Sequence, residues 1–133
     1  MLTAEQSRIR VLVVDDHELT RFSLSLALRS QEDLEMVGLA DNGRQAINMV
    51  KQHYPDVVIL DLQMPVMDGL SASIHIKAIH PEIQIIAYSS LEDPQTEVMI
   101  QTAQVDAFCK KDTATSDLIA LVRQLGQRIN SNR

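Results

Sequence analysis

The sequence predicts an α/β fold in which strands and helices alternate, a (βα)5 doubly wound five-stranded parallel sheet. Five short apolar runs alternate with segments whose apolar residues are spaced three and four positions apart. Several of the short runs are apolar at consecutive positions, which is typical of strands that are buried on both faces of a parallel sheet. Because crossovers between parallel strands are right-handed, we expect helices on both faces of this sheet.

The predicted strands are the five apolar runs, and a proline precedes two of them. Pro55 and Pro81 lie just before the third and fourth runs, where a residue without a backbone N–H donor is tolerated. The five runs are Ile9–Val14, Leu34–Ala40, Val57–Leu60, Ile83–Ser89 and Ala107–Lys111.

The segments that follow the strands are predicted helices, because each can place apolar residues on one face. In the first segment, Leu24, Ala27 and Leu28 share such a face. The Asn42-Gly43 pair is typical of a turn that leads into a helix. The five segments are Leu19–Ser30, Arg44–His53, Gly69–His80, Pro94–Ala103 and Asp117–Ile129.

The composition limits the class of protein. A chain of 133 residues with 45% hydrophobic and 23% charged content fits one globular domain. With 12 Lys+Arg against 18 Asp+Glu, the net charge of -6 argues against direct nucleic-acid binding. The lone Cys109 excludes an internal disulfide and a Cys-rich zinc site. No apolar run has the length of a signal-peptide core or a membrane span, so we expect no membrane contact and a cytoplasmic location.

Acidic residues follow two of the predicted strands. Asp61 comes directly after Val57–Leu60, and Asp15-Asp16 comes directly after Ile9–Val14. The carboxyl ends of parallel strands meet at one edge of the sheet, where open α/β folds bind ligands. Several carboxylates in one cleft repel one another unless a divalent cation neutralises them. The sequence therefore predicts a metal-dependent acidic pocket.

Residues at four separated strand ends carry a resemblance to a known family. The motif D-x-x-M-P-x-x-D-G runs from Asp61 to Gly69, Ser89 closes the fourth strand and Lys111 closes the fifth. With the acidic pair after the first strand, this pattern resembles the receiver domain of bacterial two-component response regulators. The D-D-H triplet that ends at His17 and the K-D pair that begins at Lys111 are most similar to the NarL/FixJ-type subfamily.

The resemblance covers about residues 8–126 and implies a flavodoxin-like (CheY-like) fold with strand order 2-1-3-4-5. Residues 1–7 are then an N-terminal extension. Residues 127–133 are expected to be either a C-terminal tail or the start of a linker to an output domain that is absent from this chain. Basic residues without acidic ones follow Asp117, which is compatible with both alternatives.

The resemblance also implies a role for each acidic residue. Asp61 is the expected phospho-acceptor, a carboxylate nucleophile that takes a phosphoryl group from a sensor histidine kinase. Asp16, Asp61 and the backbone carbonyl of Gln63 are the expected ligands of Mg²⁺, for which Mn²⁺ can substitute. Asp15 is expected to contact the metal indirectly, through water or as a charge partner.

Two further side chains are expected to contact the phosphoryl group. Lys111 is expected to pair with Asp61 before phosphorylation and with a phosphoryl oxygen afterwards. Lys110 competes for this role, but strand alternation sends neighbours to opposite faces, so only one of the two lysines can reach the pocket. Ser89 is expected to donate its hydroxyl, with Ser90 as the rival.

Four positions bear on switching and on the lifetime of the phosphoryl group. Phe108 stands where receivers carry an aromatic side chain that moves inward with the Ser89 hydroxyl, although plain core packing explains it as well. Leu91 cannot orient an attacking water, and Gln63 holds the other tuning position, so we expect slow dephosphorylation. Gln104 stands where a glycine usually ends the fourth helix, so the corner before the fifth strand is expected to differ.

Two other residues have a chemical and an ordinary interpretation. Cys109 lies next to two lysines and could sense redox state, but a cysteine within a strand is more often inert core. His17 follows the acidic pair and could approach the metal, but we interpret it as a solvated loop histidine. No histidine has the Cys/His spacing of a zinc site.

The predicted function is a phospho-acceptor switch and not an enzyme in the ordinary sense, although it catalyses its own phosphorylation and dephosphorylation. Phosphorylation is expected to alter the face formed by the fourth helix, fifth strand and fifth helix. The expected output is DNA binding by a missing C-terminal domain, with a stand-alone receiver as the alternative. We also expect a weak homodimer that forms on phosphorylation.

Two alternative functions compete with the switch. An Mg²⁺-dependent phosphohydrolase with an Asp nucleophile usually has a second carboxylate two residues after the nucleophile, where this chain has Gln63. A phosphorylation-independent interaction module has no need of Asp16, Asp61 and Lys111 together. A nucleotide-binding module is weaker still, because no glycine-rich phosphate loop is present.

Overall fold

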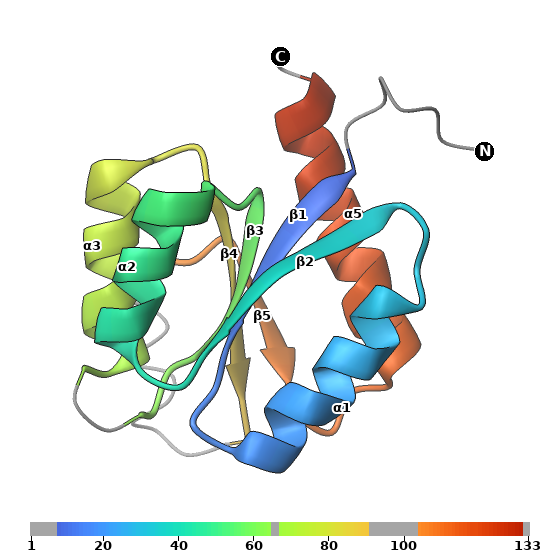
Figure 1. The fold of residues 1–133 in the computed structure, drawn as a ribbon, viewed down its shortest axis with the longest axis horizontal. Coiled ribbons are helices and arrows are strands. Elements are labelled where there is room, and N and C mark those ends of the chain that lie inside the picture. The colour runs from blue at the N-terminus through green and yellow to red at the C-terminus, as the bar shows by residue number, and fades with distance from the viewer. Residues whose placement is uncertain (1–7, 65–66, 91–103, 132–133) are drawn as a thin grey trace.

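The computed structural model describes residues 8–64, 67–90 and 104–131, and its sheet confirms the predicted fold class (Figure 1). Five parallel strands form one sheet in the order β2-β1-β3-β4-β5. The third strand includes Asp61 and the fifth ends at Lys110, each a single residue from the predicted boundary. The strands are β1 (Ile9–Val14), β2 (Leu34–Ala40), β3 (Val57–Asp61), β4 (Gln84–Ser89) and β5 (Ala107–Lys110).

Helices cover both faces of the sheet, as right-handed crossovers require. Helices α2 and α3 lie on one face, and α1 and α5 lie on the other (Figure 1). The predicted helix Pro94–Ala103 lies outside the described residues. The described helices are α1 (Glu18–Arg29), α2 (Gly43–His53), α3 (Gly69–Ile79) and α5 (Thr115–Ser131). None of these helices is long and apolar enough to cross a membrane.

Helix α5 continues past the point where the apolar pattern ends. The sequence pattern predicts this helix as far as Ile129, and the structure extends it to Ser131, so residues 127–131, where a tail or linker was also expected to begin, are helical. After Gly126 the sequence has no glycine or proline to stop the helix, and each added residue gains a backbone hydrogen bond.

Alternate residues of each strand point to opposite faces of the sheet and build two apolar layers. Val11 and Val13 of β1 pack in the same layer as Leu28 of α1, on the α1-α5 side. Leu12 of the same strand packs in the layer that contains Ile76 of α3. Burial of each such side chain stabilises the fold by about 1.5–3 kcal/mol. The two layers hold the strands in register and therefore bring their carboxyl ends to one edge.

The loop after β3 folds back onto the end of the strand at Gly69. A Cβ atom at this position would lie 2.2 Å from the carbonyl oxygen of Asp61 and 2.5 Å from Cα of Leu62. The Gly69 N–H donates to the Leu62 carbonyl at 3.1 Å. Asp68 caps α3 by accepting a hydrogen bond from the Ser71 N–H at 2.8 Å. The backbone that carries Asp61 is held by these contacts.

The corner before β5 needs no left-handed residue at Gln104. Among the described non-glycine residues only Tyr54, at the C-cap of α2, has a positive φ, of 49°. The Gln104 N–H instead donates to the Ser73 hydroxyl at 3.2 Å. The steric penalty that would make glycine necessary at this corner does not arise.

An ion pair connects α5 to the loop before β2. The guanidinium of Arg123 donates to both carboxylate oxygens of Asp33, from Nε at 2.7 Å and from Nη2 at 3.0 Å. Nη2 also donates to Oε1 of Gln31 at 2.6 Å. The hydrogen bonds from Arg123 hold the pKa of Asp33 below its ordinary value, against the opposing effect of burial.

We predict that Arg123→Gln lowers the free energy of unfolding at neutral pH by about 0.5–1 kcal/mol, the range for partly exposed ion pairs. The folded-state pKa of Asp33 is below its unfolded value, so the pair stabilises fully above about pH 4 and loses this effect as the pH falls through the folded-state pKa. Urea unfolding at neutral pH and at about pH 3 measures both limits.

Arg8→Gln is the matched control, because Arg8 makes a single contact with Glu35 at 3.0 Å and is more exposed than Arg123. The control should change stability less than Arg123→Gln. An Arg123→Gln effect of the same size at both pH values contradicts the ion pair as its cause.

Candidate functional site

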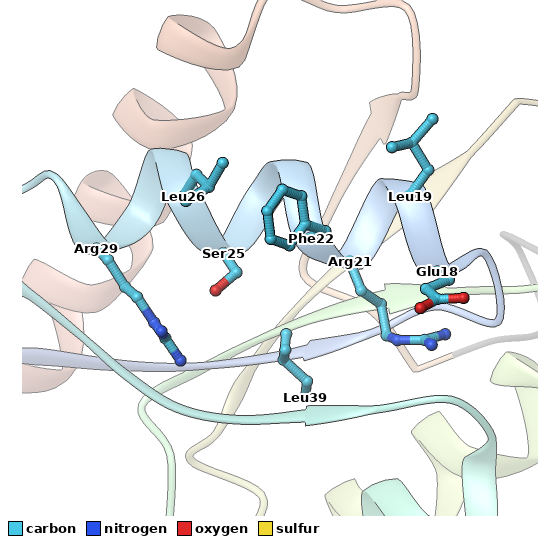
Figure 2. A pocket seen from close by; sticks show the side chains of 8 residues that line it. All are labelled: Glu18, Leu19, Arg21, Phe22, Ser25, Leu26, Arg29 and Leu39. Carbon is cyan, nitrogen blue, oxygen red and sulfur yellow. The ribbon is translucent and has the colours of Figure 1, made fainter.

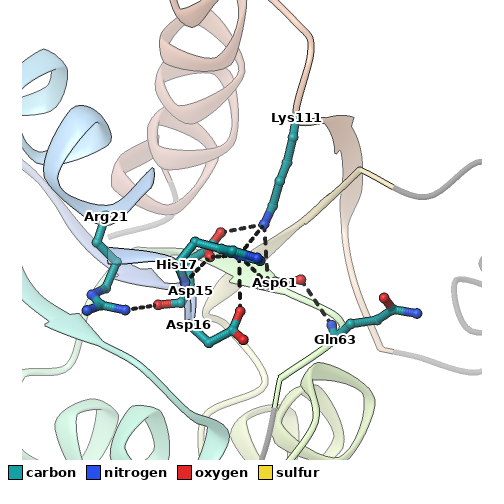
Figure 3. A network of polar contacts seen from close by, with 7 residues as sticks. All are labelled: Asp15, Asp16, His17, Arg21, Asp61, Gln63 and Lys111. Carbon is teal, nitrogen blue, oxygen red and sulfur yellow. Dashed lines mark hydrogen bonds and ion pairs between the residues drawn. The ribbon is translucent and has the colours of Figure 1, made fainter. Parts of the chain in front are cut away.

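Side chains from three strand ends meet at the carboxyl edge of the sheet (Figure 3). Asp15 and Asp16 follow β1, Asp61 is the last residue of β3, and Lys111 follows β5. Ligand atoms of the three aspartates and of His17 all lie within 4.8 Å of one another. The structure thus brings together the acidic pair, the predicted phospho-acceptor and the lysine.

Asp61 is a buried carboxylate with a different partner at each oxygen. Its side chain is only 4% exposed. Oδ1 accepts a hydrogen bond from the Gln63 N–H at 3.0 Å, and Oδ2 accepts one from Nζ of Lys111 at 3.3 Å. Burial raises the pKa of Asp61 to about 6, and the charge of Asp15 adds to this, while Gln63 and Lys111 oppose it. The carboxylate is therefore only partly neutralised by its surroundings.

Asp15 is buried as deeply as Asp61, whereas Asp16 faces outward. The Asp15 side chain is 1% exposed and the Asp16 side chain is 30% exposed. Oδ1 of Asp15 accepts the His17 N–H at 2.8 Å. Oδ2 of Asp15 lies 2.7 Å from Nζ of Lys111 in an ion pair, and no other polar group of the described residues bonds to it. This buried oxygen therefore retains a lone pair for another ligand.

Lys111 is the cation that balances these carboxylates. Its Nζ lies 2.7 Å from Oδ2 of Asp15 and 3.3 Å from Oδ2 of Asp61. Burial alone would lower the pKa of Lys111, but the contacts with the two carboxylates outweigh it and raise the pKa. Of the two adjacent lysines, Lys111 thus lies in the cluster, while Lys110 is an exposed residue at the end of β5.

The His17 side chain is 64% exposed, as expected of a solvated loop histidine, but its ring also lies against the acidic pair. Its Nδ1 lies 2.9 Å from Oδ1 of Asp15 and 3.2 Å from Oδ1 of Asp16. The reason is local, because the His17 N–H bonds to the Asp15 carboxylate and closes a turn that carries the ring over the acidic pair.

Arg21 is a further neighbour of the site that sequence reasoning did not single out. Its Nη1 donates to the backbone carbonyl of Asp15 at 2.6 Å (Figure 3). The Arg21 N–H donates to the His17 carbonyl at 3.0 Å, so the residue lies one helical turn after the loop. The sequence feature that could have indicated this contact is the basic residue four positions after the D-D-H triplet.

The other predicted residues occupy the same edge or the adjoining core. Ser89 is buried at the end of β4, and its carbonyl accepts the Lys111 N–H at 3.0 Å, whereas Ser90 is exposed. Phe108 is half-buried and packs against the cluster of Leu62 and Ala87. Leu91 lies outside the described residues, so slow dephosphorylation stays a prediction.

Cys109 has the properties of a core residue. It is buried, and burial is the main cause that raises the pKa of its thiol. A raised pKa keeps the thiol protonated near neutral pH, which fits the inert interpretation and not a reactive thiolate.

The donor atoms suit a hard divalent cation. Asp15, Asp16 and Asp61 offer carboxylate oxygens at one point, and these are the ligands that Mg²⁺ prefers. Apart from the ion pair with Lys111, the buried Oδ2 of Asp15 has no polar partner among the described residues and can accept a hydrogen bond from a metal-bound water. The residues present therefore fit Mg²⁺.

Comparison with known families identifies the family of this domain. The family model of the response regulator receiver domain matches residues 11–123, most of the chain. The chain belongs to this family. In this receiver domain, the D-D-H triplet, Asp61 and Lys111 meet at the acidic edge of the sheet (Figure 3). A receiver domain of a response regulator is a signalling protein of a two-component system.

Similar proteins agree with this assignment. The response regulator protein VraR from Staphylococcus epidermidis is 36% identical over 116 residues, which are 87% of this chain and 56% of that protein. The receiver domain therefore spans about half the length of the curated relatives it matches. The signal receiver domain of the putative response regulator NarL from Mycobacterium tuberculosis is 28% identical with a TM-score of 0.85, over 92% of this chain and 98% of that one.

A third similar structure is the CheX-CheY-BeF3-Mg+2 complex from Borrelia burgdorferi. The match is 27% identical with a TM-score of 0.78, over 88% of each chain. The NarL and VraR relatives confirm that this receiver domain is similar to the LuxR/NarL type.

We predict that Asp61→Asn raises the free energy of unfolding at about pH 8 without divalent ions, by about 1–3 kcal/mol. The folded-state pKa of about 6 is above the ordinary value of 3.8, so the folded chain holds the proton more tightly. The contribution of Asp61 to the free energy of unfolding therefore falls as the pH rises from about 4 to about 6. At about pH 4 the wild type and Asp61→Asn should be similarly stable, because Asp61 is then protonated in the folded chain.

Urea unfolding of both proteins in EDTA at the two pH values measures this effect. Asp112→Asn, at an exposed position beyond Lys111, is the control and should change stability little. Added Mg²⁺ should stabilise the wild type more than the Asp61 variant. A variant that is less stable than the wild type at about pH 8 contradicts the prediction.

Proposed function

We propose that Asp61 is the phospho-acceptor of this receiver domain and that a histidine kinase is its donor. The observation that carries the proposal is a buried carboxylate with a raised pKa, 3.3 Å from a lysine ammonium, at the carboxyl edge of a parallel sheet. A carboxylate oxygen of Asp61 attacks phosphorus, the phosphorus–nitrogen bond of the donor phosphohistidine breaks, and the electron pair goes to the imidazole nitrogen. A cytoplasmic location is part of this proposal.

The proposed metal is Mg²⁺, with Mn²⁺ as a substitute. Asp16 and Asp61 would hold it together with the carbonyl of Gln63, and Asp15 would act through water. When bound, the ion offsets negative charge on the phosphoryl oxygens. The Borrelia burgdorferi structure that contains BeF3 and Mg+2 supports this choice by similarity.

The chain's own residues position the reacting groups. Lys111 is already paired with Asp61, and we propose that its ammonium moves to a phosphoryl oxygen after transfer. The Gln63 N–H holds Oδ1 of Asp61 and leaves the other oxygen directed toward the cluster. The Ser89 hydroxyl is proposed as a further donor to the phosphoryl group, and Phe108 as the side chain that follows its movement.

Phosphorylation is tested by incubating the chain with Mg²⁺ and acetyl phosphate and measuring intact mass. The expected result is one phosphoryl adduct on the wild type and none on Asp61→Asn, because the amide is not a nucleophile. Omission of Mg²⁺ should suppress the adduct. Asp112→Asn is the matched control and should be labelled like the wild type.

The opposite outcomes separate the alternatives. An adduct that persists in Asp61→Asn places the acceptor elsewhere. Turnover of phosphate esters without an adduct favours a phosphohydrolase. A wild type that takes no phosphoryl group from acetyl phosphate or from kinases favours an interaction module.

We propose that the exposed apolar side of α1 receives the kinase. Leu19, Phe22 and Leu26 lie along this helix and are 79%, 60% and 58% exposed (Figure 2). Spacings of three and four residues put them on one side of the helix. Helix α1 begins at Glu18, close to the acidic pair. A kinase helix that docks on α1 can therefore bring its phosphohistidine close to Asp61.

We predict that Phe22→Glu reduces phosphotransfer from the cognate histidine kinase by about tenfold, the effect of losing a central aromatic contact of about 1.4 kcal/mol. Labelling by acetyl phosphate should be unchanged, because Phe22 does not contact the acidic cluster. Tyr54→Glu is the control, since Tyr54 is similarly exposed, at 57%, but lies near the opposite edge of the sheet. Equal loss from both donors contradicts a docking role.

The output is proposed to lie outside this chain. The receiver is proposed to occupy about residues 8–126, with residues 127–133 leading to an output domain. The relatives named VraR are about twice as long as the matched part, which supports an additional domain in proteins of this kind. Phosphorylation is proposed to act through the fourth helix, β5 and α5, with a homodimer as the active form.

A further inference from the structure

His17 places an imidazole nitrogen among the carboxylates of the acidic cluster. Its Nδ1 lies 2.9 Å from Oδ1 of Asp15, 3.2 Å from Oδ1 of Asp16 and 4.0 Å from Oδ2 of Asp61 (Figure 3). No other described histidine belongs to this group of potential metal ligands. The ring is therefore the one imidazole among the potential metal ligands of the described residues. Its Nδ1 also lies 3.5 Å from Nζ of Lys111.

These separations fit the ligands of one shared ion. Ligands at about 2.1 Å from an octahedral ion lie about 3.0 Å apart when adjacent and about 4.2 Å apart when opposite. The distances from His17 to Asp16 and to Asp61 both lie within this range, so the nitrogen and the two carboxylate oxygens would be able to share one ion. An ion held by Asp16 and Asp61 can therefore take the nitrogen as a ligand with small displacements.

The position of the ring is set by the backbone. The His17 N–H donates to Asp15 at 2.8 Å, and the His17 carbonyl accepts the Arg21 N–H at 3.0 Å. Backbone hydrogen bonds thus connect His17 to the end of β1 and to the first turn of α1. Its side chain is still 64% exposed, so ions from solvent have access to the nitrogen.

We propose that His17 is a metal ligand that makes this site accept ions with a preference for imidazole, such as Co²⁺, Ni²⁺ and Zn²⁺, in addition to Mg²⁺. An all-oxygen site suits Mg²⁺, and a nitrogen donor adds affinity along the series from Mn²⁺ to Zn²⁺. The inference rests on the proposed metal site and goes beyond it, because it gives the site a second class of ion.

The test compares asparagine substitutions at two histidines. His17→Asn removes the nitrogen donor but keeps the backbone N–H that bonds to Asp15. His75→Asn is the matched control, because His75 is an exposed residue of α3 whose Nδ1 lies 2.9 Å from the Ser71 carbonyl. Calorimetric titration with Co²⁺ and with Mg²⁺ measures the dissociation constants of all three proteins.

The Kd for Co²⁺ should rise about tenfold or more in His17→Asn. Removal of an outer-shell partner of a metal already lowers metal affinity by about tenfold, and loss of a direct ligand should cost at least as much. The Kd for Mg²⁺ should stay unchanged in this variant, and both constants should stay unchanged in His75→Asn. Equal Co²⁺ affinity in His17→Asn and the wild type overturns the proposal and leaves His17 as a hydrogen-bond partner of Asp15.

Pulsed EPR of the wild-type chain with Co²⁺ at low temperature gives a second readout that needs no variant. A coordinated imidazole nitrogen modulates the Co²⁺ signal, and nitrogen-15 histidine shifts the modulation frequency. Absence of this modulation overturns the inference while Mg²⁺ binding and phosphorylation remain intact. A chain that binds neither Mg²⁺ nor Co²⁺ and takes no phosphoryl group fails the proposed function and this inference together.

Discussion

The pairing of two buried carboxylates with one ammonium group is the interaction on which the site depends. Nζ of Lys111 lies 2.7 Å from Asp15 and 3.3 Å from Asp61, at strand ends far apart in the sequence. Burial of unpaired charges costs several kcal/mol per ion, and one cation offsets only part of the penalty for two anions. The pKa of Asp61, raised to about 6, reflects this incomplete balance. The cluster therefore retains an excess of negative charge, which favours a further cation.

Contacts with the backbone around the cluster keep its carboxylates in place despite their mutual repulsion. Gly69 packs against the carbonyl of Asp61 so closely that a Cβ atom has no space. Gln63 binds one oxygen of Asp61, and Arg21 binds the carbonyl of Asp15. Carboxylates on the ends of buried parallel strands have little freedom to move apart, so repulsion between them is relieved by binding and not by rearrangement.

The elements that sequence reasoning predicted well are those encoded by local patterns. Consecutive apolar residues and the Asn42-Gly43 turn marked strands and a helix start, and the structure has Asn42 as the N-cap of α2. The pocket could be inferred because its acidic residues follow strands directly. The orientation of His17 could not, because it depends on a turn closed by its own N–H. The pair of Arg123 with Asp33 joins residues 90 positions apart and has no local signal.

The sequence by itself determined the family, the alternating order of strands and helices, and which residue types lie at the strand ends. These follow from periodicity and punctuation, which act over a few residues. Only the tertiary structure decided how far each group lies from Asp61, how deeply Asp15 is buried and that His17 lies among the carboxylates. Distances, burial and pKa values depend on segments from β1, β3 and β5 that meet only when the sheet has formed, and a linear pattern does not contain them.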